Sequence, residues 1–310
     1  RGVDGFRFDA VGNLVENGPS AWENQPENFT LMGNIRDMVG GSYANRFLVC
    51  EGPSAPLAFA TACGSAFAFG HQSDLINAAK GNTTAISNLA NYFGTAPGTA
   101  PATMSTMLSN HDSFAGDRAM DQFNGNESQY RLAAATYLLQ PGTPFIYYGE
   151  EIGMRGGNLS GDPKLRTPMS WTSSNIGATG FTIGTPFRAL SANVADHNVQ
   201  TQQAVGSLLN WYKAVIAVRQ ANPALRSGTH VSATAAGTTL SFQRASGNQR
   251  AVVMINYGSG DQLISAGGLP PNGVLTSVFP PGGANADINA SGTASASIPA
   301  KSLRVFVIAI

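Results

Sequence analysis

The 310-residue sequence predicts an α/β fold, with parallel βα units followed by an all-β domain. Two observations support this prediction. Short apolar runs alternate with helical patterns up to about residue 222, at the spacing of parallel βα units. After Pro223 the content of Gly, Ser, Thr and Ala rises, and short alternating runs appear between Gly, Asn and Pro turns, as in antiparallel sheets. We therefore place one domain at residues 1–223 and a second at residues 224–310.

The elements of the first domain follow from the apolar pattern. Its apolar runs predict strands at residues 4–9, 46–51, 66–70, 104–109 and 144–148. Helical periodicity predicts helices near residues 28–40, 84–93, 127–140 and 203–220. The last helix ends at Asn222-Pro223, because proline interrupts a helix. In the second domain, runs such as RAVVMINYG and KSLRVFVIAI predict the strands of an antiparallel β-sandwich.

The composition excludes some partners. The 18 basic and 18 acidic side chains balance, which argues against a nucleic acid or an anionic membrane, because each would require a basic face. No apolar run approaches the roughly 20 residues of a membrane span. Charged residues make up only 12% of the chain. This weakly charged, polar composition favours a secreted protein, extracellular or periplasmic.

The sequence contains two cysteines, Cys50 and Cys63. In a secreted protein such a pair suggests a disulfide. However, Cys50 ends one predicted strand, whereas Cys63 comes just before the next, so in a parallel sheet they would lie at opposite edges. A bridge requires Cα atoms within about 7 Å. We therefore favour two buried free thiols and keep the disulfide as the alternative.

The first strand carries a charged pair. Side chains alternate along a strand, so Arg7 and Asp9 share one face while Phe6 and Phe8 share the other. Asp9 lies at the C-terminal end of the strand, where barrels of parallel strands build their active sites. A structural Arg–Asp ion pair is the alternative interpretation.

Two more strands end in acidic residues. Glu51 follows the run FLVC, and Asn110, His111 and Asp112 follow MSTMLS. Barrel closure would bring Asp9, Glu51 and Asp112 to one mouth. Three carboxylates around one cleft suit glycoside hydrolysis, with a nucleophile, a general acid/base and a residue that stabilises the transition state. From the residue types alone, a divalent-metal site is the competing interpretation.

Six segments resemble conserved regions of the α-amylase family, glycoside hydrolase family 13. They are GVDGFRFDA, FLVCEGP, LSNHDSF, GTPFIYYGEEIGM (142–154), RTPMSW (166–171) and SLLNWYKAVIAVRQANPALRSG (207–228). The resemblance implies a (β/α)8 TIM barrel, of which this chain carries about strands 4–8, followed by an all-β C-terminal sandwich. Family barrels have three strands before the first motif. We expect this N-terminal half to come from the same polypeptide or from a companion fragment.

The resemblance also implies roles. Asp9 corresponds to the nucleophile, Glu51 to the general acid/base and Asp112 to the residue that stabilises the transition state. Arg7 is expected to orient and ionise Asp9, and His111 to hydrogen-bond the same sugar.

The remaining candidates carry weaker signals. His71 ends the predicted third strand (66–70), the sixth of the family barrel, and is a candidate substrate-binding residue, with a structural role as the equal alternative. Tyr147 and Tyr148 are expected to pack in the barrel, and Arg166 to form a structural ion pair.

The sequence departs from the family after Asp9. Many α-amylases have Lys-His where this chain has Gly12 and Asn13, and that pair contributes to an aglycone subsite and to calcium binding. We therefore expect no cofactor in the chemistry and assign no residue to a metal, although the family allows a structural calcium ion.

The expected substrate is an α-glucan. The main prediction is an α-amylase-type retaining glycosidase that cleaves the α-1,4 bonds of starch or maltooligosaccharides. The loop AVGNLVENGPSAWENQPENF also resembles that of trehalose synthases and sucrose-acting members, and GEEIGM and RTPMSW are common in α-glucosidases. An α-glucosidase, or a trehalose synthase or other transglycosylase of the family, is thus the alternative. A non-catalytic carbohydrate-binding subunit is a remote one.

Overall fold

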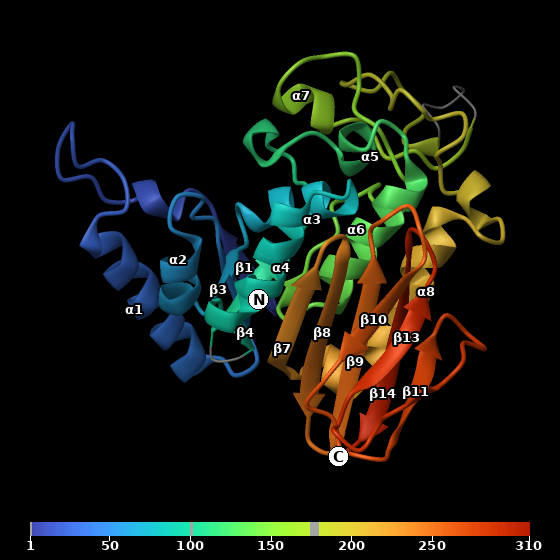
Figure 1. Cartoon of the computed structure of the whole chain (residues 1–310). Helices are drawn as coiled ribbons and strands as arrows, with labels where there is room; N and C mark the ends of the chain where they lie inside the picture. The colour runs from blue at the N-terminus through green and yellow to red at the C-terminus, as the bar shows by residue number, and fades with distance from the viewer. Residues whose placement is uncertain (1, 100–101, 174–179) are drawn as a thin grey trace.

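The computed structural model describes residues 2–99, 102–173 and 180–310 (Figure 1). Its first sheet has the order β1-β2-β3-β5-β4, with β6 also paired to β5. The strands are β1 (Gly5–Phe8), β2 (Phe47–Cys50), β3 (Ser65–Phe67), β4 (Gly98–Thr99), β5 (Ala102–Thr106) and β6 (Thr143–Pro144). All pair in parallel except β4, which runs antiparallel to β5. Each of the five predicted strands therefore has a counterpart, and together they form part of a barrel. The fifth is much shorter than predicted, because β6 ends at Pro144 and residues 145–148 are not in a strand.

Four predicted helices are also confirmed. They are α1 (Pro26–Ser42), α4 (Thr83–Thr95), α6 (Glu127–Leu139) and α8 (Leu208–Ala221). Side chains of Asn82, Asn126 and Ser207 accept hydrogen bonds from the first turns of α4, α6 and α8 and so cap otherwise unpaired N–H groups. The sequence prediction missed two helices of eight and nine residues, α2 (Pro56–Cys63) and α3 (His71–Ala79). The remaining helices are short: α5 (Ala119–Gln122), α7 (Asp162–Leu165), α9 (Pro223–Arg226), and the 3-10 turns η1 (Val11–Asn13), η2 (Ser113–Ala115) and η4 (Thr201–Gln203).

The C-terminal region is an antiparallel β structure, as predicted. A six-stranded sheet has the order β12-β11-β14-β9-β8-β7, and a separate pair, β10-β13, packs on one of its faces. The strands are β7 (Thr229–Ala236), β8 (Thr239–Ser246), β9 (Gln249–Asn256), β10 (Gln262–Ala266), β11 (Val274–Phe279), β12 (Ala286–Asp287), β13 (Ala294–Ile298) and β14 (Ser302–Ala309). Val252 and Met254 of β9 pack with Ile264 of β10 in the core between the two layers.

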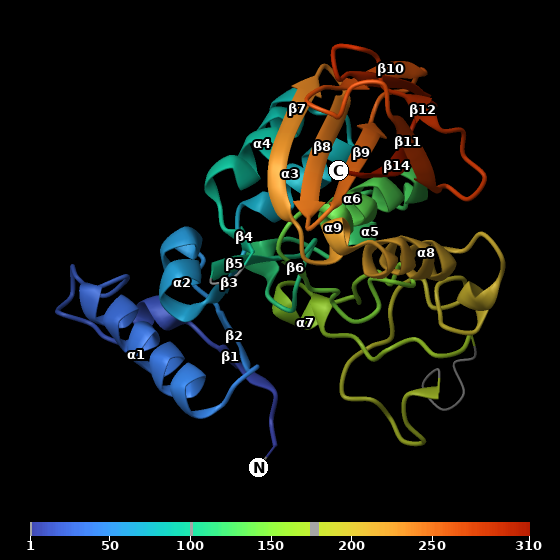
Figure 2. The same ribbon diagram turned by 90° about the horizontal axis from the view of Figure 1, so that it is seen from below.

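The other face of this sheet packs on α3, α4, α6 and α8 (Figure 2). One continuous core crosses the junction, and two buried arginines reinforce it. Arg219 of α8 and Arg244 of β8 donate to backbone carbonyls of Leu138, Leu139 and Gln140 at the end of α6. Cations at a helix C-terminus satisfy its free carbonyls and oppose its dipole. The barrel helices are thereby fixed to the C-terminal sheet.

The prediction of free thiols is wrong, because Cys50 and Cys63 form a disulfide with Cα atoms 6.2 Å apart. Parallel strands β2 and β3 are staggered, so that Cys50 pairs in register with Ala66. The start of β3 therefore lies level with the end of β2, and Cys63, just before β3, comes within reach. The two cysteines would lie at opposite edges only if the ends of the two strands were level.

In the described part of the chain, the parallel sheet does not close into a complete barrel. β1 and β6 lie at its two sides and do not pair with each other. The Phe6 side chain on β1 is 52% exposed. No helix in the described part of the chain is long and apolar enough to cross a bilayer.

Candidate active site

The site begins where β1 ends. Arg7 pairs in register with Val49, so Arg7, Asp9 and Glu51 project from the same side of the β1–β2 pair. Ala10 then adopts a left-handed conformation (φ 44°, ψ 44°), which is uncommon for a residue with a side chain. This turn directs the Ala10 N–H onto Glu51 Oε2 at 3.0 Å. Backbone strain of this kind is often concentrated at functional sites.

Arg7 connects the two carboxylates. Its Nη1 pairs with Asp9 Oδ1, and its Nη2 lies 3.0 Å from Glu51 Oε2. The Asp9 side chain is 74% exposed, whereas the Glu51 side chain is 6% exposed. One carboxylate is thus open to solvent, and its neighbour is enclosed.

The environment shifts the two pKa values in opposite directions. A hydrogen bond with Glu51 is the main cause that lowers the pKa of Asp9, and the Arg7 charge lowers it further. Burial acts in the opposite direction but has a smaller effect than the hydrogen bond. Burial raises the pKa of Glu51, with the Asp9 hydrogen bond and charge acting in the same direction, although Ala10 and Arg7 oppose the shift. Two neighbouring acids separated in this way can act as an ionised base or nucleophile and a protonated acid.

The loop after β5 supplies the third carboxylate. His111 Nε2 lies 3.2 Å from Asp112 Oδ2, and Asn110 Oδ1 accepts from the Asp112 N–H at 2.8 Å. Arg166 forms ion pairs with Asp112 at 2.8 Å and with Asp162 at 3.1 Å, as expected for an ion-pair residue. The Asp112 side chain is 16% exposed, so it is held by several partners at the edge of solvent.

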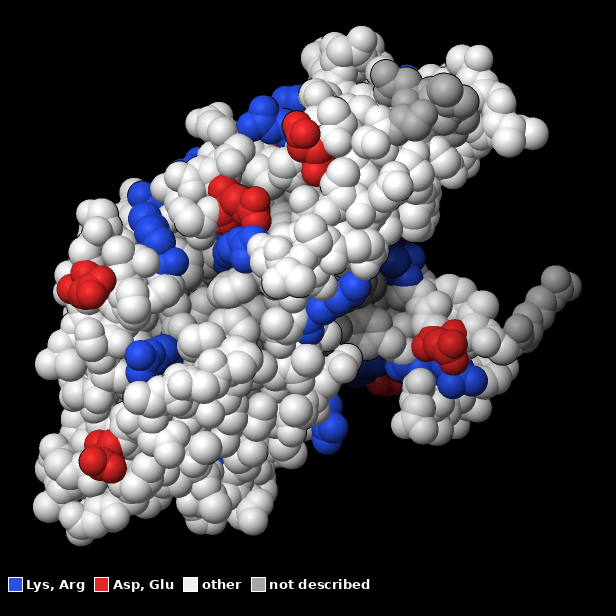
Figure 3. Space-filling model, turned by 90° about the vertical axis from the view of Figure 1, so that its right-hand side faces the viewer, with Lys and Arg blue, Asp and Glu red and all other residues white. Residues whose placement is uncertain are grey.

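One cavity lies between Arg7 on β1 and the loop after β5 that carries His111. Its volume is about 260 Å³, and both Arg7 and His111 line it. The charge of His111 also lowers the pKa of Asp9. The structure therefore brings Arg7, Asp9 and Glu51 near the loop of His111 and Asp112. Figure 3 shows a recess on one face of the molecule, with both basic and acidic side chains at its border.

His71 does not join this cavity. It begins α3 instead of ending a strand, because the chain turns at Gly70 (φ +89°) directly after the run AFAF. The His71 ring is 2% exposed, stacks on Tyr92 with centroids 3.9 Å apart, and its Nε2 lies 3.0 Å from Gln140 Oε1. Burial lowers its pKa to about 4, so the ring is neutral. The expectation that His71 faces the cleft is corrected to a packing role.

Tyr147 and Tyr148 differ from their expected role in barrel packing. Their rings lie on Arg118, each with its centroid 4.7 Å from the guanidinium carbon. Arg118 is buried and donates to the carbonyls of Tyr148 and Leu165. No sequence motif singled out Arg118, which fixes the loops around the mouth.

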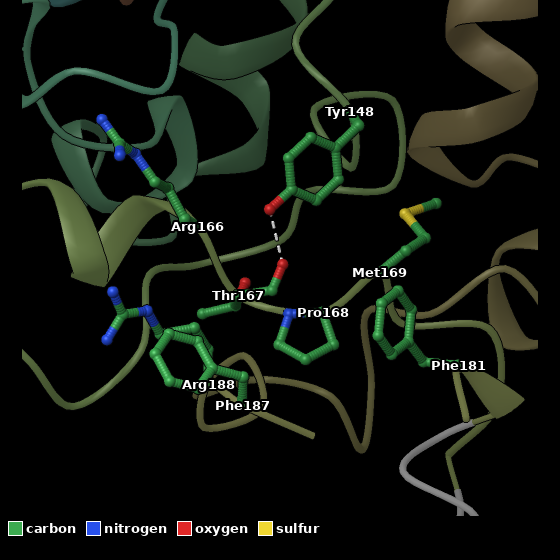
Figure 4. Close-up of a pocket in the computed structure, with 8 residues that line it drawn as sticks. All are labelled: Tyr148, Arg166, Thr167, Pro168, Met169, Phe181, Phe187 and Arg188. Atoms are coloured by element: carbon green, nitrogen blue, oxygen red, sulfur yellow. Dashed lines mark hydrogen bonds between the residues drawn. The ribbon is translucent and has the colours of Figure 1, made fainter. Parts of the chain in front are cut away.

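A second pocket, of about 340 Å³, is lined by Arg166, which also forms the ion pair with Asp112 (Figure 4). Tyr148 donates its hydroxyl to the Thr167 carbonyl at 2.5 Å on one side. The other lining residues are Pro168, Met169, Phe181, Phe187 and Arg188. Sequence reasoning missed Phe181 and Phe187, and their only signal is that apolar aromatics stand in a polar segment.

The described residues do not assemble a cage of acidic ligands for calcium. In that part of the chain no group of three or more His, Cys, Asp or Glu side chains could hold a metal ion.

A partial barrel of parallel strands, with neighbouring acids at the C-terminal ends of adjacent strands, has the architecture of barrel enzymes, whose active sites lie at these strand ends. A model of the alpha-amylase catalytic domain matches residues 1–228. The chain therefore belongs to the alpha-amylase family of glycoside hydrolases and transglycosylases, as its motifs indicated.

Relatives in the family have different activities. The chain is 28% identical over 276 residues to the trehalose synthase/amylase TreS of Mycolicibacterium smegmatis, a match that covers 74% of this chain and 46% of TreS. It is 40% identical over 124 residues to the alpha-amylase SusG of Bacteroides thetaiotaomicron, covering 40% of this chain and 17% of SusG. The chain thus spans about half, or less, of these relatives.

Solved structures show the same fold. The alpha-amylase from H. orenii superposes with a TM-score of 0.75 over 98% of this chain and 61% of its own, at 24% identity. The alpha-glucosyl transfer enzyme XgtA superposes with a TM-score of 0.74 over 99% of this chain and 64% of its own, at 21% identity. At these identities the likeness establishes the fold alone.

Proposed function

We propose that this chain carries the catalytic carboxylates of a retaining enzyme that cleaves the α-1,4-glucosidic bonds of starch or maltooligosaccharides. The observation that carries the proposal is the Arg7 bridge between an exposed Asp9 and an enclosed Glu51. Retaining glycosidases require an ionised nucleophile beside a protonated acid, and the opposite pKa shifts of these two carboxylates meet that requirement.

In the proposed mechanism, Asp9 attacks the anomeric carbon while Glu51 donates its proton to the departing glycosidic oxygen. A covalent glycosyl-Asp9 intermediate results. Glu51, now ionised, removes a proton from water, and the water oxygen displaces Asp9 with net retention. Asp112 and His111 bind hydroxyls of the same sugar, and Arg7 keeps Asp9 ionised.

A second candidate differs only in the acceptor. A trehalose synthase forms the same intermediate but transfers the glucosyl group to a sugar hydroxyl instead of to water. The long match to TreS and the loop at residues 10–29 favour this candidate. A non-catalytic subunit is disfavoured because all three carboxylates are present.

Product analysis with the complete gene product distinguishes these functions. The proposal predicts new reducing ends from soluble starch. Trehalose formed from maltose without a gain in reducing ends would instead identify the synthase. Asp9→Asn and Glu51→Gln should each lower turnover by roughly 10²–10⁴-fold or more. Asp37→Asn, on the exposed surface of α1, is a matched control, and unchanged turnover in either site variant would refute the proposal.

Two further proposals concern the rest of the barrel and the location of the protein. We propose that additional barrel strands complete the sheet beyond β1 and β6, because these two strands do not pair with each other and Phe6 of β1 is half exposed. We also propose an oxidising location, extracellular or periplasmic, because disulfides such as Cys50–Cys63 persist mainly in such compartments.

A further inference from the structure

The disulfide lies directly beside the proposed acid/base. Cys50 is the last residue of β2, and Glu51 follows it, so the bridged residue and the carboxylate-bearing residue share one peptide bond. Both half-cystines are buried on the helix side of the sheet, whereas Glu51 projects from the other side toward Arg7. The closed loop, with a sequence separation of 13, contains Glu51 and helix α2.

Backbone pairing holds the end of β2 unequally on its two sides. Toward β1, four register pairs form, and the Glu51 N–H donates to the Phe8 carbonyl at 2.9 Å. Toward β3, the only register pair is Cys50 with Ala66. Because Cys63 lies just before β3, the disulfide adds a covalent link on the less paired side. The bridge therefore helps to set where Glu51 lies relative to β3.

Helix α2 also contacts the peptide that follows Glu51. Phe59 of α2 packs so closely on Gly52 that a Cβ there would lie 2.2 Å from Phe59 Cδ2. A shift of α2 against β2 would thus move the Glu51 backbone. Two donors, Arg7 Nη2 and the Ala10 N–H, hold the carboxylate at 3.0 Å each, and small displacements would break both contacts.

We propose that the Cys50–Cys63 disulfide is a redox-sensitive positioning element for Glu51. When the bridge is closed, the carboxylate is fixed against Arg7 and Ala10. When it is open, the protein stays folded but positions its acid/base poorly. The inference rests on the proposed role of Glu51. In the opening step a dithiol reductant transfers two electrons and two protons to the disulfide, which becomes two thiols while the reductant becomes a cyclic disulfide.

The experiment compares oxidised and dithiothreitol-reduced full-length protein on maltooligosaccharides, with free thiols counted by alkylation and mass spectrometry. We expect kcat to fall about tenfold or more, with KM nearly unchanged, because misplacement of a catalytic group by about 1 Å can cost up to 10²-fold. The alkaline limb of the pH–rate profile should move to higher pH, since the contacts with Ala10 and Arg7, which opening the bridge would break, lower the pKa of Glu51. Reoxidation should restore both.

Cys63→Ala opens the bridge without changing the neighbour of Glu51, and it should reproduce the reduced enzyme and no longer respond to dithiothreitol. If the bridge of the folded wild type resists the reductant, the claim of redox sensitivity is overturned, and the variant then tests the positioning role alone. If the variant does not fold, reduction of the folded wild type decides. A lower unfolding temperature with unchanged kcat and pH limb would reduce the bridge to a stabilising role and overturn the inference. Glu51→Gln is measured in parallel, and full turnover in that variant would instead overturn the proposed function.

Discussion

The guanidinium of Arg7 lies 3.0 Å from Glu51 Oε2 while its other terminal nitrogen pairs with Asp9. A single cation thus holds an exposed and an enclosed carboxylate together at the ends of adjacent parallel strands. Its charge lowers the pKa of both acids, but burial outweighs it at Glu51. The contrast between the two pKa values therefore comes from the burial of Glu51 and from the hydrogen bond between the two acids, and not from Arg7.

This relationship predicts the pH dependence of the enzyme. Activity should rise with ionisation of Asp9, whose pKa lies below its ordinary 3.8, and fall with ionisation of Glu51, whose pKa lies above its ordinary 4.5. Arg7→Ala should move both limbs to higher pH, because the cation favours the ionised form of each acid. We expect turnover to fall by about 10²–10³-fold, as for other lost electrostatic partners. Arg36→Ala on α1 is the control; limbs that stay in place in Arg7→Ala would contradict this account.

A second prediction separates acid catalysis from nucleophilic attack. Glu51→Gln should lower the rate on maltooligosaccharides by roughly 10²–10⁴-fold, because the leaving group loses its proton donor. With an α-glucosyl fluoride, whose leaving group needs no proton, the first step should stay near the wild-type rate. Presteady-state release of fluoride measures this. Equal losses on both substrates would assign Glu51 a different role.

Glu150 provides a prediction about stability. It is buried, and its Oε1 accepts hydrogen bonds from Tyr137 at 2.6 Å and Tyr212 at 2.8 Å. Burial raises its pKa from 4.5 to about 7, so between these values the folded state holds a proton that the unfolded state has lost. Stability from this group is full below pH 4.5 and declines as the pH rises to about 7, by roughly 3 kcal/mol.

Glu150→Gln keeps an acceptor for both tyrosines but does not titrate. The variant should be more stable than the wild type at pH 8 and lose this part of the pH dependence, as measured by urea denaturation at several pH values. A wild-type slope that survives in the variant would show that another group is responsible.

The two candidate histidines, His71 and His111, should differ in their effects on stability and on substrate binding. His71→Ala should lower stability by about 1–3 kcal/mol, because Gln140 loses its buried partner, with little change in KM. His111→Ala should leave the unfolding temperature nearly unchanged but weaken substrate binding, since His111 lines the cavity beside Arg7. Differential scanning calorimetry and steady-state kinetics on both variants provide the comparison. A large KM effect in His71→Ala would restore its expected place at the cleft.

The functional strand ends could be predicted from the sequence because charged side chains directly follow residues that pattern as buried strands. A carboxylate that terminates an apolar run is costly unless it is used or paired, and this signal located Glu51. Asp9 was located by its position at the C-terminal end of a strand. Helix α2 gave no such signal. Its sequence PLAFATAC is almost uniformly apolar, so it lacks the polar face that makes a helical period visible.

Two of the failures concern relationships between distant segments, and a third concerns a local turn. The disulfide was misjudged because the stagger of β2 and β3 is a property of barrel geometry that neither strand's sequence contains. His71 was misplaced because the turn at Gly70 ends the strand earlier than the apolar run suggests. Arg118 was missed because its partners, two aromatic rings and two carbonyls, are about 30 or more residues away.

The most direct measurement is to trap the covalent intermediate on the full-length protein. A fluorinated α-glucosyl fluoride forms the intermediate but slows its hydrolysis, and peptide mass spectrometry then locates the attached sugar. The account predicts one glucosyl group on Asp9, with no labelling in Asp9→Asn. A sugar attached to another residue, or turnover without any covalent adduct, would contradict the central claim that Asp9 is the nucleophile held by Arg7 beside Glu51.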